Sequence, residues 1–215
     1  MPLRGLRPAL LAGLSDDERM ALFSECTPLH FAATAEILSQ GEPAPAAFLI
    51  VKGRVEVTFL DDDGNQVMAH IAVPGEVMGE VEMLSGKTCA ATCRAQAGTD
   101  LLMFSEAILL KYLPVASVLR NFASILHSRL VRDTMLHAIA QYYPAKARIC
   151  IHLHRLSGRD KDISISQSQL ALLAGCTRQT VNATLAELRD QGVIELGRGQ
   201  IKVLDPHRLR SLAET

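Results

Sequence analysis

The sequence predicts an α+β chain in three parts: an antiparallel β-domain, a long helix, and a C-terminal pair of short helices followed by a β-hairpin. Three observations predict it. Strand-like runs separated by Gly, Pro and Asp turns fill residues 47–104, residues 115–140 contain neither Gly nor Pro, and capping and turn residues punctuate residues 145–205. With 48% hydrophobic and 21% charged residues, the chain is globular rather than disordered. We expect its parts to span residues 1–114, 115–143 and 144–215.

The N-terminus begins like an export signal, with arginines ahead of the apolar stretch Ala9–Leu14. Six apolar residues are too few for such a signal. The following S-x-x-E motif, Ser15 to Glu18, is a capping box and predicts a helix from about Ser15 to Ser24. No run of about 18 apolar residues occurs, so the sequence favours a cytoplasmic protein without a membrane span.

The chain has five scattered cysteines: Cys26, Cys89, Cys93, Cys150 and Cys176. An odd, scattered set without a C-x-x-C pair does not indicate a disulfide framework or an iron–sulfur centre. Cys89 and Cys93 are the only close pair, and we expect them to be small core residues on a strand. The alternative is a thiol switch.

The β-domain is predicted from alternation between turns. Residues 47–51 form a buried-strand run, and the Asp-rich segment 61–65 is a hairpin turn between two alternating strands. The apolar positions expected to share one face are Val55, Val57 and Phe59 before the turn and Val67, Ala69, Ile71 and Val73 after it. Further strands are expected at 88–95 and 100–104. Many short strands with such turns indicate an antiparallel barrel or sandwich.

A residue pattern typical of helices begins at residue 108, and Pro114 and Pro144 flank the predicted long helix. Its seam has residues three and four apart, as in a coiled coil: Ala123, Leu126, Leu130, Asp133, His137 and Ala140. The seam predicts dimerisation, although a helix packed on its own β-domain would show a similar pattern. Asp133 and His137 lie one turn apart, and we hypothesise a buried polar pair that fixes register or responds to pH.

The last part carries the most informative pattern. After a helix over residues 145–154, a short amphipathic helix over 167–173 stops near Gly175, and Thr177 is a good N-cap for the next helix. That helix has Val181, Leu185 and Leu188 on one face. Strands at 193–196 and 200–203 then flank a Gly-Arg-Gly tip. The sequence therefore predicts a helix-turn-helix with a hairpin wing.

Residue types and charge in this part favour contact with double-stranded DNA. Residues 1–140 carry 11 Lys and Arg against 16 Asp and Glu, whereas residues 141–215 carry 11 against 7. Arg178, Gln179 and Asn182 are expected on the open face of the second helix, where Arg suits guanine and Gln or Asn suits adenine. Residues expected at the DNA backbone are Ser166, Gln167, Thr177, Thr180, Arg198 and Lys202.

Two stretches resemble the cyclic-AMP receptor protein/FNR (Crp/Fnr) family of bacterial transcription regulators. They are QLALLAGCTRQTVNATLAELRDQGVIELGRGQI in the C-terminal part and FLIVKGRVEV followed by PGEVMGEVEML in the front. The resemblance implies a cyclic-nucleotide-binding-like β-roll, and a homodimer joined through the long helix that reads a near-palindromic site and works with RNA polymerase. Family members often present Arg-Glu and a second Arg on the recognition helix. This chain has Arg178-Gln179 and Ala183, so its preferred bases should differ.

The same resemblance locates a candidate effector pocket. Gly79 and Glu80 match the pair whose Glu takes the ribose hydroxyl in cyclic-nucleotide-binding members. The arginine that holds the cyclic phosphate falls on Cys89, followed by Ala90, and the positions that meet the base fall on Asp133 and Thr134. A thiol cannot neutralise a phosphate, and a carboxylate opposes an anion. We therefore expect an effector other than a cyclic nucleotide, of unknown identity, and no cofactor.

Two alternatives remain on the sequence alone: a redox-responsive regulator using Cys89 and Cys93, and a cyclic-nucleotide-binding regulatory protein. An enzyme is not expected, because the strands carry no His-x-His or carboxylate cluster with metal-ligand spacing and no nucleophile–base pair. The histidines of the front half are scattered and suggest no pair of haem ligands.

Overall fold

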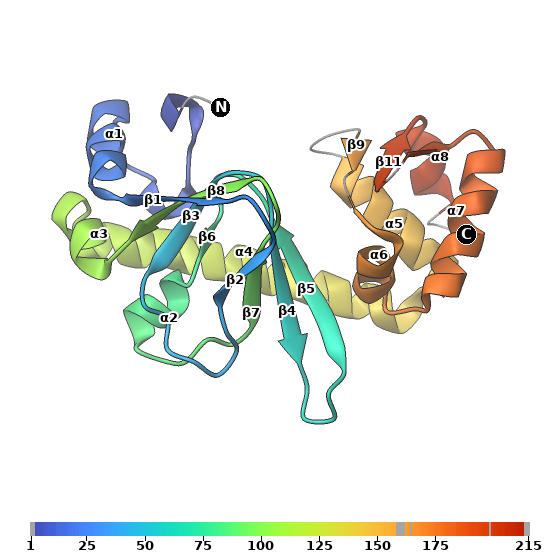
Figure 1. Ribbon diagram of the computed structural model, residues 1–215, viewed down its shortest axis with the longest axis horizontal. Coiled ribbons are helices and arrows are strands. Elements are labelled where there is room, and N and C mark those ends of the chain that lie inside the picture. Colours follow the sequence, from blue (N-terminus) through green and yellow to red (C-terminus); the bar gives the residue numbers. More distant parts are fainter. Residues whose placement is uncertain (1–2, 158–161, 164, 198, 213–215) are drawn as a thin grey trace. The chain divides into compact units, whose positions relative to one another are not determined.

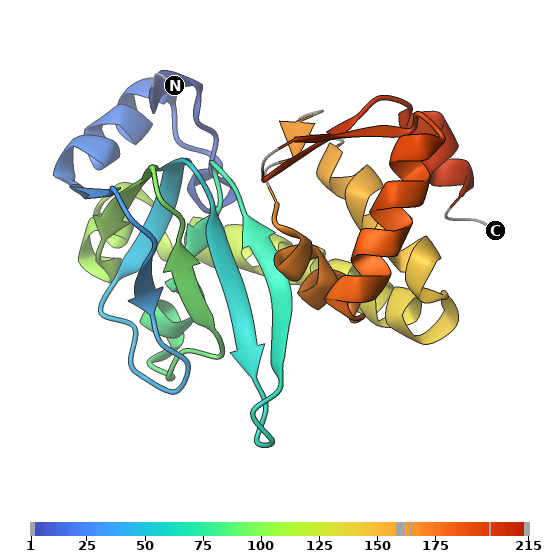
Figure 2. The same ribbon diagram turned by 45° about the vertical axis from the view of Figure 1, so that its right-hand side comes forward.

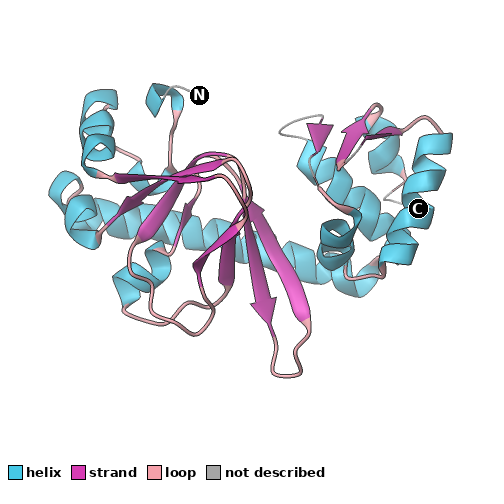
Figure 3. Cartoon of the chain, in the orientation of Figure 1, coloured by secondary structure: helices cyan, strands magenta, loops and turns pink. Residues whose placement is uncertain are grey.

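The computed structural model describes residues 3–157, 162–163, 165–197 and 199–212 (Figure 1). The chain forms two compact units, one up to Leu130 and one from Val131 onward. The division falls within a long helix that contributes to both units. Antiparallel sheets in the first unit, the long helix, and a helix-turn-helix with a wing in the second confirm the predicted fold class (Figure 3).

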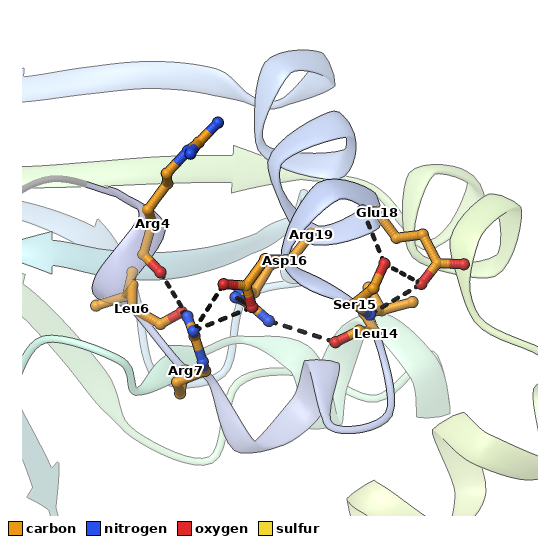
Figure 4. Close-up of polar contacts among 8 residues, drawn as sticks. All are labelled: Arg4, Leu6, Arg7, Leu14, Ser15, Asp16, Glu18 and Arg19. Atoms are coloured by element: carbon orange, nitrogen blue, oxygen red, sulfur yellow. Dashed lines mark hydrogen bonds and ion pairs between the residues drawn. The ribbon is translucent and has the colours of Figure 1, made fainter.

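The first unit begins with two 3-10 helices, Leu3–Gly5 and Ala9–Leu11, and helix α1, Asp16–Glu25. The predicted capping box is formed. The Ser15 hydroxyl accepts from the Glu18 amide at 3.3 Å, and the Ser15 amide donates to the Glu18 carboxylate at 2.8 Å (Figure 4). Buried Arg19 donates to Asp16 at 2.6 Å, and this hydrogen bond lowers the pKa of Asp16. The start of α1 is therefore as predicted.

Eight strands of the first unit form two four-stranded antiparallel sheets, visible in Figure 2. The first sheet has the order β1-β8-β3-β6, with β1 Thr27–Phe31, β8 Thr99–Phe104, β3 Ala47–Lys52 and β6 Val77–Met78. The second has the order β2-β7-β4-β5, with β2 Ala35–Leu38, β7 Thr92–Ala95, β4 Val55–Leu60 and β5 Gln66–Ala72.

Strand β3 lies between two hydrophobic clusters. Ala47 and Leu49 belong to one cluster, which also contains Leu22 of α1, and Phe48 and Ile50 belong to the other. Successive side chains of a strand point to opposite faces, so β3 is covered on both faces. This explains why residues 47–51 form a continuous apolar run, and it confirms the predicted buried strand.

The alternation predicted for the β4–β5 hairpin is wrong near the turn. Val57 pairs with His70 but Thr58 pairs with Met68, so Ala69 is an extra residue in β5. An extra residue reverses which face the following side chains take. In β5, Met68 is consequently buried and Val67 is 50% exposed. On β4, which has no extra residue, Thr58 is buried and Phe59 is 44% exposed, which the predicted alternation does not explain. A bulge of this kind has no signature in the hydrophobic pattern.

A second correction concerns residues 80–95. The short helix α2, Glu80–Ser85, was not predicted, and the strand expected from residue 88 begins only at Thr92. Cys89 therefore lies in the preceding loop, whereas Cys93 lies on β7. Both side chains are buried in the same hydrophobic cluster, in agreement with a role as small core residues.

Helix α3, Glu106–Tyr112, leads into the long helix α4, Val115–Tyr142. The α4 side chain of Asn121 donates to the carbonyl oxygens of Leu10 at 2.9 Å and Ala12 at 2.8 Å, which fixes the N-terminal segment on the helix. Among the described residues no single helix is long and apolar enough to cross a membrane. Helices α3 and α4 reach that composition only when taken together, and they meet at a bend of 113°.

The second unit contains four more helices and a small antiparallel sheet of order β10-β11-β9. The helices are α5 Ala145–Ser157, α6 Gln167–Ala174, α7 Arg178–Asp190 and α8 Pro206–Ser211. The strands are β9 Asp162–Ile163, β10 Ile194–Gly197 and β11 Gln200–Val203. Helix α5 packs against α6, α7 and α8 and buries Ile149 and Leu153, so it forms the centre of this unit. Helix α8 was not predicted.

Candidate functional site

The turn between α6 and α7 is fixed from three sides. Ser166 caps α6 in a capping box with Gln169, and Gly175 ends that helix in the left-handed conformation at φ 57°. Arg148 of α5 donates from Nε to the Ala174 carbonyl at 2.7 Å and from Nη2 to the Gly175 carbonyl at 2.9 Å. The stop at Gly175 was predicted, whereas the capping box of Ser166 and Gln169 was not. Arg148 was also missed, because its partners lie 26 and 27 residues away.

Helix α7 is anchored by its apolar face. Thr177 is the N-cap, and its side chain accepts from the Thr180 amide at 3.1 Å. Val181, Leu185 and Leu188 are buried, as the spacing predicted. These contacts hold the opposite face of α7 toward solvent.

The predicted base-reading side chains lie on the open side of this helix. Arg178, Gln179 and Asn182 are all exposed and belong to the first five residues of α7. Ala183, which follows them, is also exposed. The N-terminal end of α7 thus presents a guanidinium and two amides without a bulky neighbour, as a recognition helix must.

The residues predicted to contact the DNA backbone differ in exposure and in hydrogen bonding. The hydroxyls of Thr177 and Thr180 lie 2.8 Å apart and bond to each other, and Thr180 is half-buried. Ser166 is exposed and Gln167 half-buried at the start of α6. Lys202 is exposed on β11 and pairs in register with Glu195 of β10. Arg198 lies outside the described residues.

Residues from α6, α7 and the wing also line a partly open pocket of about 280 Å³. Ser166, Gln167 and Arg178 line it together with Leu185, Gln200 and Ile201. Two of the predicted backbone-contacting residues are thus brought next to one of the predicted base readers. Lys202 does not line this pocket.

In the first unit, Gly79 and Glu80 form the junction between β6 and α2. Gly79 has φ 80°, and a Cβ there would lie 2.9 Å from the Ala46 carbonyl oxygen, so only glycine fits without strain. Glu80 follows as the first residue of α2, and its side chain is 1% exposed. The pair is therefore held rigidly, with the carboxylate directed into the unit.

Glu80 has one ionic partner. Arg129 of α4 donates from Nη2 to Glu80 Oε1 at 2.5 Å and to the Val77 carbonyl at 3.3 Å. Glu80 Oε2 is also buried and has no hydrogen-bond partner among the residues that the structure describes. Burial raises the pKa of Glu80 above its usual value, and the nearby Arg129 offsets only part of that rise. Arg129 was missed from the sequence because it lies 49 residues from its partner.

Comparison with known proteins gives a match in each unit. A family model described as "Cyclic nucleotide-binding domain" matches residues 28–114, and one described as "Crp-like helix-turn-helix domain" matches residues 147–212. Together they cover most of the chain in the order expected for a Crp/Fnr regulator. The chain belongs to the Crp/Fnr family.

The sequences of known relatives match this Crp/Fnr protein over most of its length. It is 29% identical over 180 residues to the "Cyclic AMP receptor protein" of Thermus thermophilus, covering 82% of this chain and 83% of that one. It is 28% identical over 197 residues to "Transcriptional regulator SdrP" of the same organism, covering 87% and 94%. The structure of FixK2 from Bradyrhizobium japonicum has a TM-score of 0.77 at 23% identity, covers 87% of this chain and 96% of that one, and shows the shared fold. The protein is a DNA-binding transcription regulator of the Crp/Fnr type.

The resemblance assigned the phosphate-holding position to Cys89, and this residue of the Crp/Fnr protein is buried and uncharged. Cys89 is 3% exposed, its amide donates to the Glu42 carbonyl at 2.8 Å, and burial raises the pKa of its thiol. Ala90 is exposed, and its amide donates to Glu82 at 3.2 Å. Burial also raises the pKa of Cys93, to about 12. Neither sulfur is therefore a thiolate at neutral pH.

Asp133 and Thr134 belong to the second unit and are exposed on α4. The Asp133 carboxylate accepts from Arg132 Nε at 3.0 Å, and His137 is exposed one turn further on. Nothing in the single chain joins Asp133 to His137, so their pairing stays a prediction about a dimer. Among the described residues, no three His, Cys, Asp or Glu side chains gather as metal ligands would.

Proposed function

We propose that the protein acts as a homodimer joined through α4 and reads a near-palindromic DNA site with one α7 in each half-site. The observation that carries this proposal is the apolar stripe on α4: Leu119, Leu126 and Leu130 are 69%, 40% and 65% exposed at spacings of seven and four residues. Large apolar side chains repeated along one exposed helix face favour a partner helix.

Base recognition is assigned to three residues of α7. Arg178 suits a bidentate contact with guanine O6 and N7, whereas Gln179 and Asn182 suit adenine N6 and N7. Exposure of all three near the start of the helix supports the assignment. Ser166, Gln167, Thr177, Thr180, Arg198 and Lys202 are proposed to contact the DNA backbone. Recruitment of RNA polymerase by the bound dimer completes the proposal, and no catalytic step is assigned.

The effector is proposed to be something other than cyclic AMP or cyclic GMP. Cys89 is a buried neutral thiol, and Glu80 already has Arg129 as a partner. A cyclic phosphate would find no arginine at position 89 to balance its charge. The competing proposal is cyclic AMP binding, which the name of the relative in Thermus thermophilus favours. The raised pKa values of Cys89 and Cys93 disfavour the redox alternative.

The test is selection of bound DNA from a random pool by the purified full-length chain, with and without cyclic AMP and a cell metabolite extract. We expect enrichment of a two-fold related pair of half-sites and no response to cyclic AMP. Calorimetric titration with cyclic AMP checks the second point directly. Enrichment of no sequence would refute the DNA-reading assignment, and tight cyclic AMP binding would refute the effector assignment alone.

A further inference from the structure

The open face of α7 changes from polar to apolar along the helix. Gln179 and Asn182 present amides near its start, but the face continues with two alanines, of which Ala183 is exposed and Ala186 is half-buried. The two residues between these alanines are buried. Residues four apart on a helix lie on one face, so Ala183 stands directly beyond Gln179. No long side chain therefore separates the helix backbone from a partner surface at this point.

The charged side chains further along α7 have partners within the protein. Glu187 accepts from Lys146 Nζ of α5 at 2.5 Å and from Gln191 at 3.1 Å. The Arg189 guanidinium donates to the Asp190 carboxylate at 2.7 Å. Beyond its two amides, α7 therefore presents the methyl groups of alanine to a base edge, rather than a free donor or acceptor.

In the major groove the apolar group of a base edge is the C5 methyl of thymine. A polar base-edge group that loses its water against an alanine is left without a hydrogen-bond partner, and this costs free energy. The thymine methyl has no hydrogen bond to lose, and the contact removes apolar surface from water. An exposed alanine on the reading face consequently favours thymine over the other bases.

We propose that Ala183 contacts a thymine methyl group in each half-site and is a fourth specificity-determining residue of α7. The inference rests on the proposed docking of α7 in the major groove, and it names a base that the three polar readers leave open. Four residues of an α-helix span about 6 Å, or about two base-pair steps of 3.4 Å. The thymine should therefore lie one or two base pairs from the pair that Gln179 contacts.

The first experiment uses the DNA that the full-length chain selects from a random pool. Each thymine of the half-site is replaced in turn by deoxyuridine, in both half-sites together. The affinity is measured at constant ionic strength, because DNA binding depends on salt. Deoxyuridine lacks only the C5 methyl group and keeps the hydrogen-bonding groups of thymine, so any loss of affinity reports on the methyl contact.

We expect one thymine whose replacement weakens binding about fourfold per half-site, or roughly 15-fold for both, as for the burial of one methyl-sized group. This position should be one or two base pairs from the pair whose preference changes in Gln179→Ala. A selected site in which no thymine shows such a loss would overturn the proposal.

The second experiment removes the methyl group on the protein side. In Ala183→Gly the same deoxyuridine replacement should change the affinity by less than twofold. Each comparison is between two DNAs bound to one protein, so the general cost of a glycine in the helix cancels. Ala186→Gly is the matched control, because it introduces the same glycine one turn further from the start of α7. It should retain the full fourfold effect.

The outcomes separate this inference from the proposed function. An undiminished deoxyuridine effect in Ala183→Gly, or an effect lost equally in Ala186→Gly, would reject the contact with Ala183 while leaving DNA reading by α7 intact. If the parent chain enriched no sequence from the pool, the proposed function would fail and the thymine contact would fail with it.

Discussion

Arg178 and Lys202 stand on different elements of the second unit, and their expected roles differ accordingly. Arg178 is exposed at the start of α7, where it can reach a base edge, whereas Lys202 is exposed on a wing strand. We expect Arg178→Ala to relax the preference at one base pair per half-site and to cost about 1–3 kcal/mol of discrimination. The measurement is repeated selection from a random pool together with affinity for the parent's preferred site.

Lys202→Ala is the matched control for that variant. It should weaken binding to all sequences alike and reduce the slope of log K against log salt by about 1 for each subunit. If Arg178→Ala left both the preferred sequence and the affinity unchanged, the assignment of α7 as the reading helix in this orientation would be wrong.

His152 gives a second prediction at the scale of one residue. It is 6% exposed in α5, and burial, then the charges of Arg155 and Arg148, lower its pKa to about 4 from 6.5. In the unfolded chain, His152 takes up a proton as the pH falls below 6.5, whereas in the folded chain it stays neutral down to about pH 4. The stability that neutral His152 contributes is therefore complete above pH 6.5 and is lost as the pH falls toward 4.

We expect the free energy of unfolding of the second unit to fall by about 2 kcal/mol from pH 7.5 to pH 5 because of this residue alone. His152→Leu should remove that part of the pH dependence in urea titrations. Replacement of the exposed His207 by Gln should leave the pH dependence as in the parent. Identical pH profiles for the parent and His152→Leu would refute the assignment.

At the scale of elements, the Glu80–Arg129 pair ties α4 to α2. Removing Arg129 would leave the buried Glu80 carboxylate without its cation. Loss of one partner of a buried ion pair lowers the free energy of unfolding by about 3 kcal/mol at the lower end of the usual range. We take the lower end because the Arg129 side chain is 30% exposed. Arg129→Met should therefore destabilise the first unit by about that amount in chemical denaturation.

The double variant Glu80→Gln, Arg129→Met is the control, because it leaves no buried charge. It should recover much of the stability lost in Arg129→Met. The pKa of Glu80 is raised in the folded chain, so the protonated form is favoured there. The loss in Arg129→Met should accordingly grow as the pH rises and shrink toward pH 5. Additive effects of the two substitutions would show that the pair does not couple these elements.

These elements also show what sequence reasoning can reach. Ser15 with Glu18, the stop at Gly175 and the N-cap Thr177 were identified in advance, because capping depends on residues close together in the sequence. The buried run of β3 and the apolar face of α7 were predicted for the same reason: their periodicity is local. The helix-turn-helix and its candidate reading residues could therefore be placed to within a residue or two.

What was missed depends on contacts between distant residues. Arg129 meets Glu80, and Arg148 meets the α6–α7 turn, only because the fold brings their elements together. The extra residue Ala69 reverses the face of Val67 on the same strand, although Val67 belongs to a regular apolar alternation in the sequence. Helix α2 has six residues, too few for a periodic signal. For the candidate sensor site, Gly79 and Glu80 were consequently named from the sequence, whereas Arg129, which binds the Glu80 carboxylate, was not.

At the scale of the whole molecule, charge separates the two ends of the chain. Residues 141–215 carry 11 basic against 7 acidic side chains, and residues 1–140 carry 11 against 16. The acidic part contributes repulsion from DNA, so specific contacts must come from the basic part. A single recognition helix offers few such contacts. In a dimer, binding of the first recognition helix holds the second one near its half-site at a high effective concentration, and this raises the overall affinity.

The last prediction tests that dimer. Leu126→Glu with Leu130→Glu places two like charges on the exposed stripe of α4, and in a dimer four carboxylates would meet across the seam. We expect a monomer by light scattering and a loss of affinity for the full two-fold site of roughly 100-fold or more. Binding to an isolated half-site should stay within threefold, because each α7 is unaltered. Ser124→Glu adds one carboxylate at an exposed position away from the stripe and should leave both properties unchanged. A dimer that survives the double substitution, or equal losses on the full site and the half-site, would place the interface elsewhere on the chain.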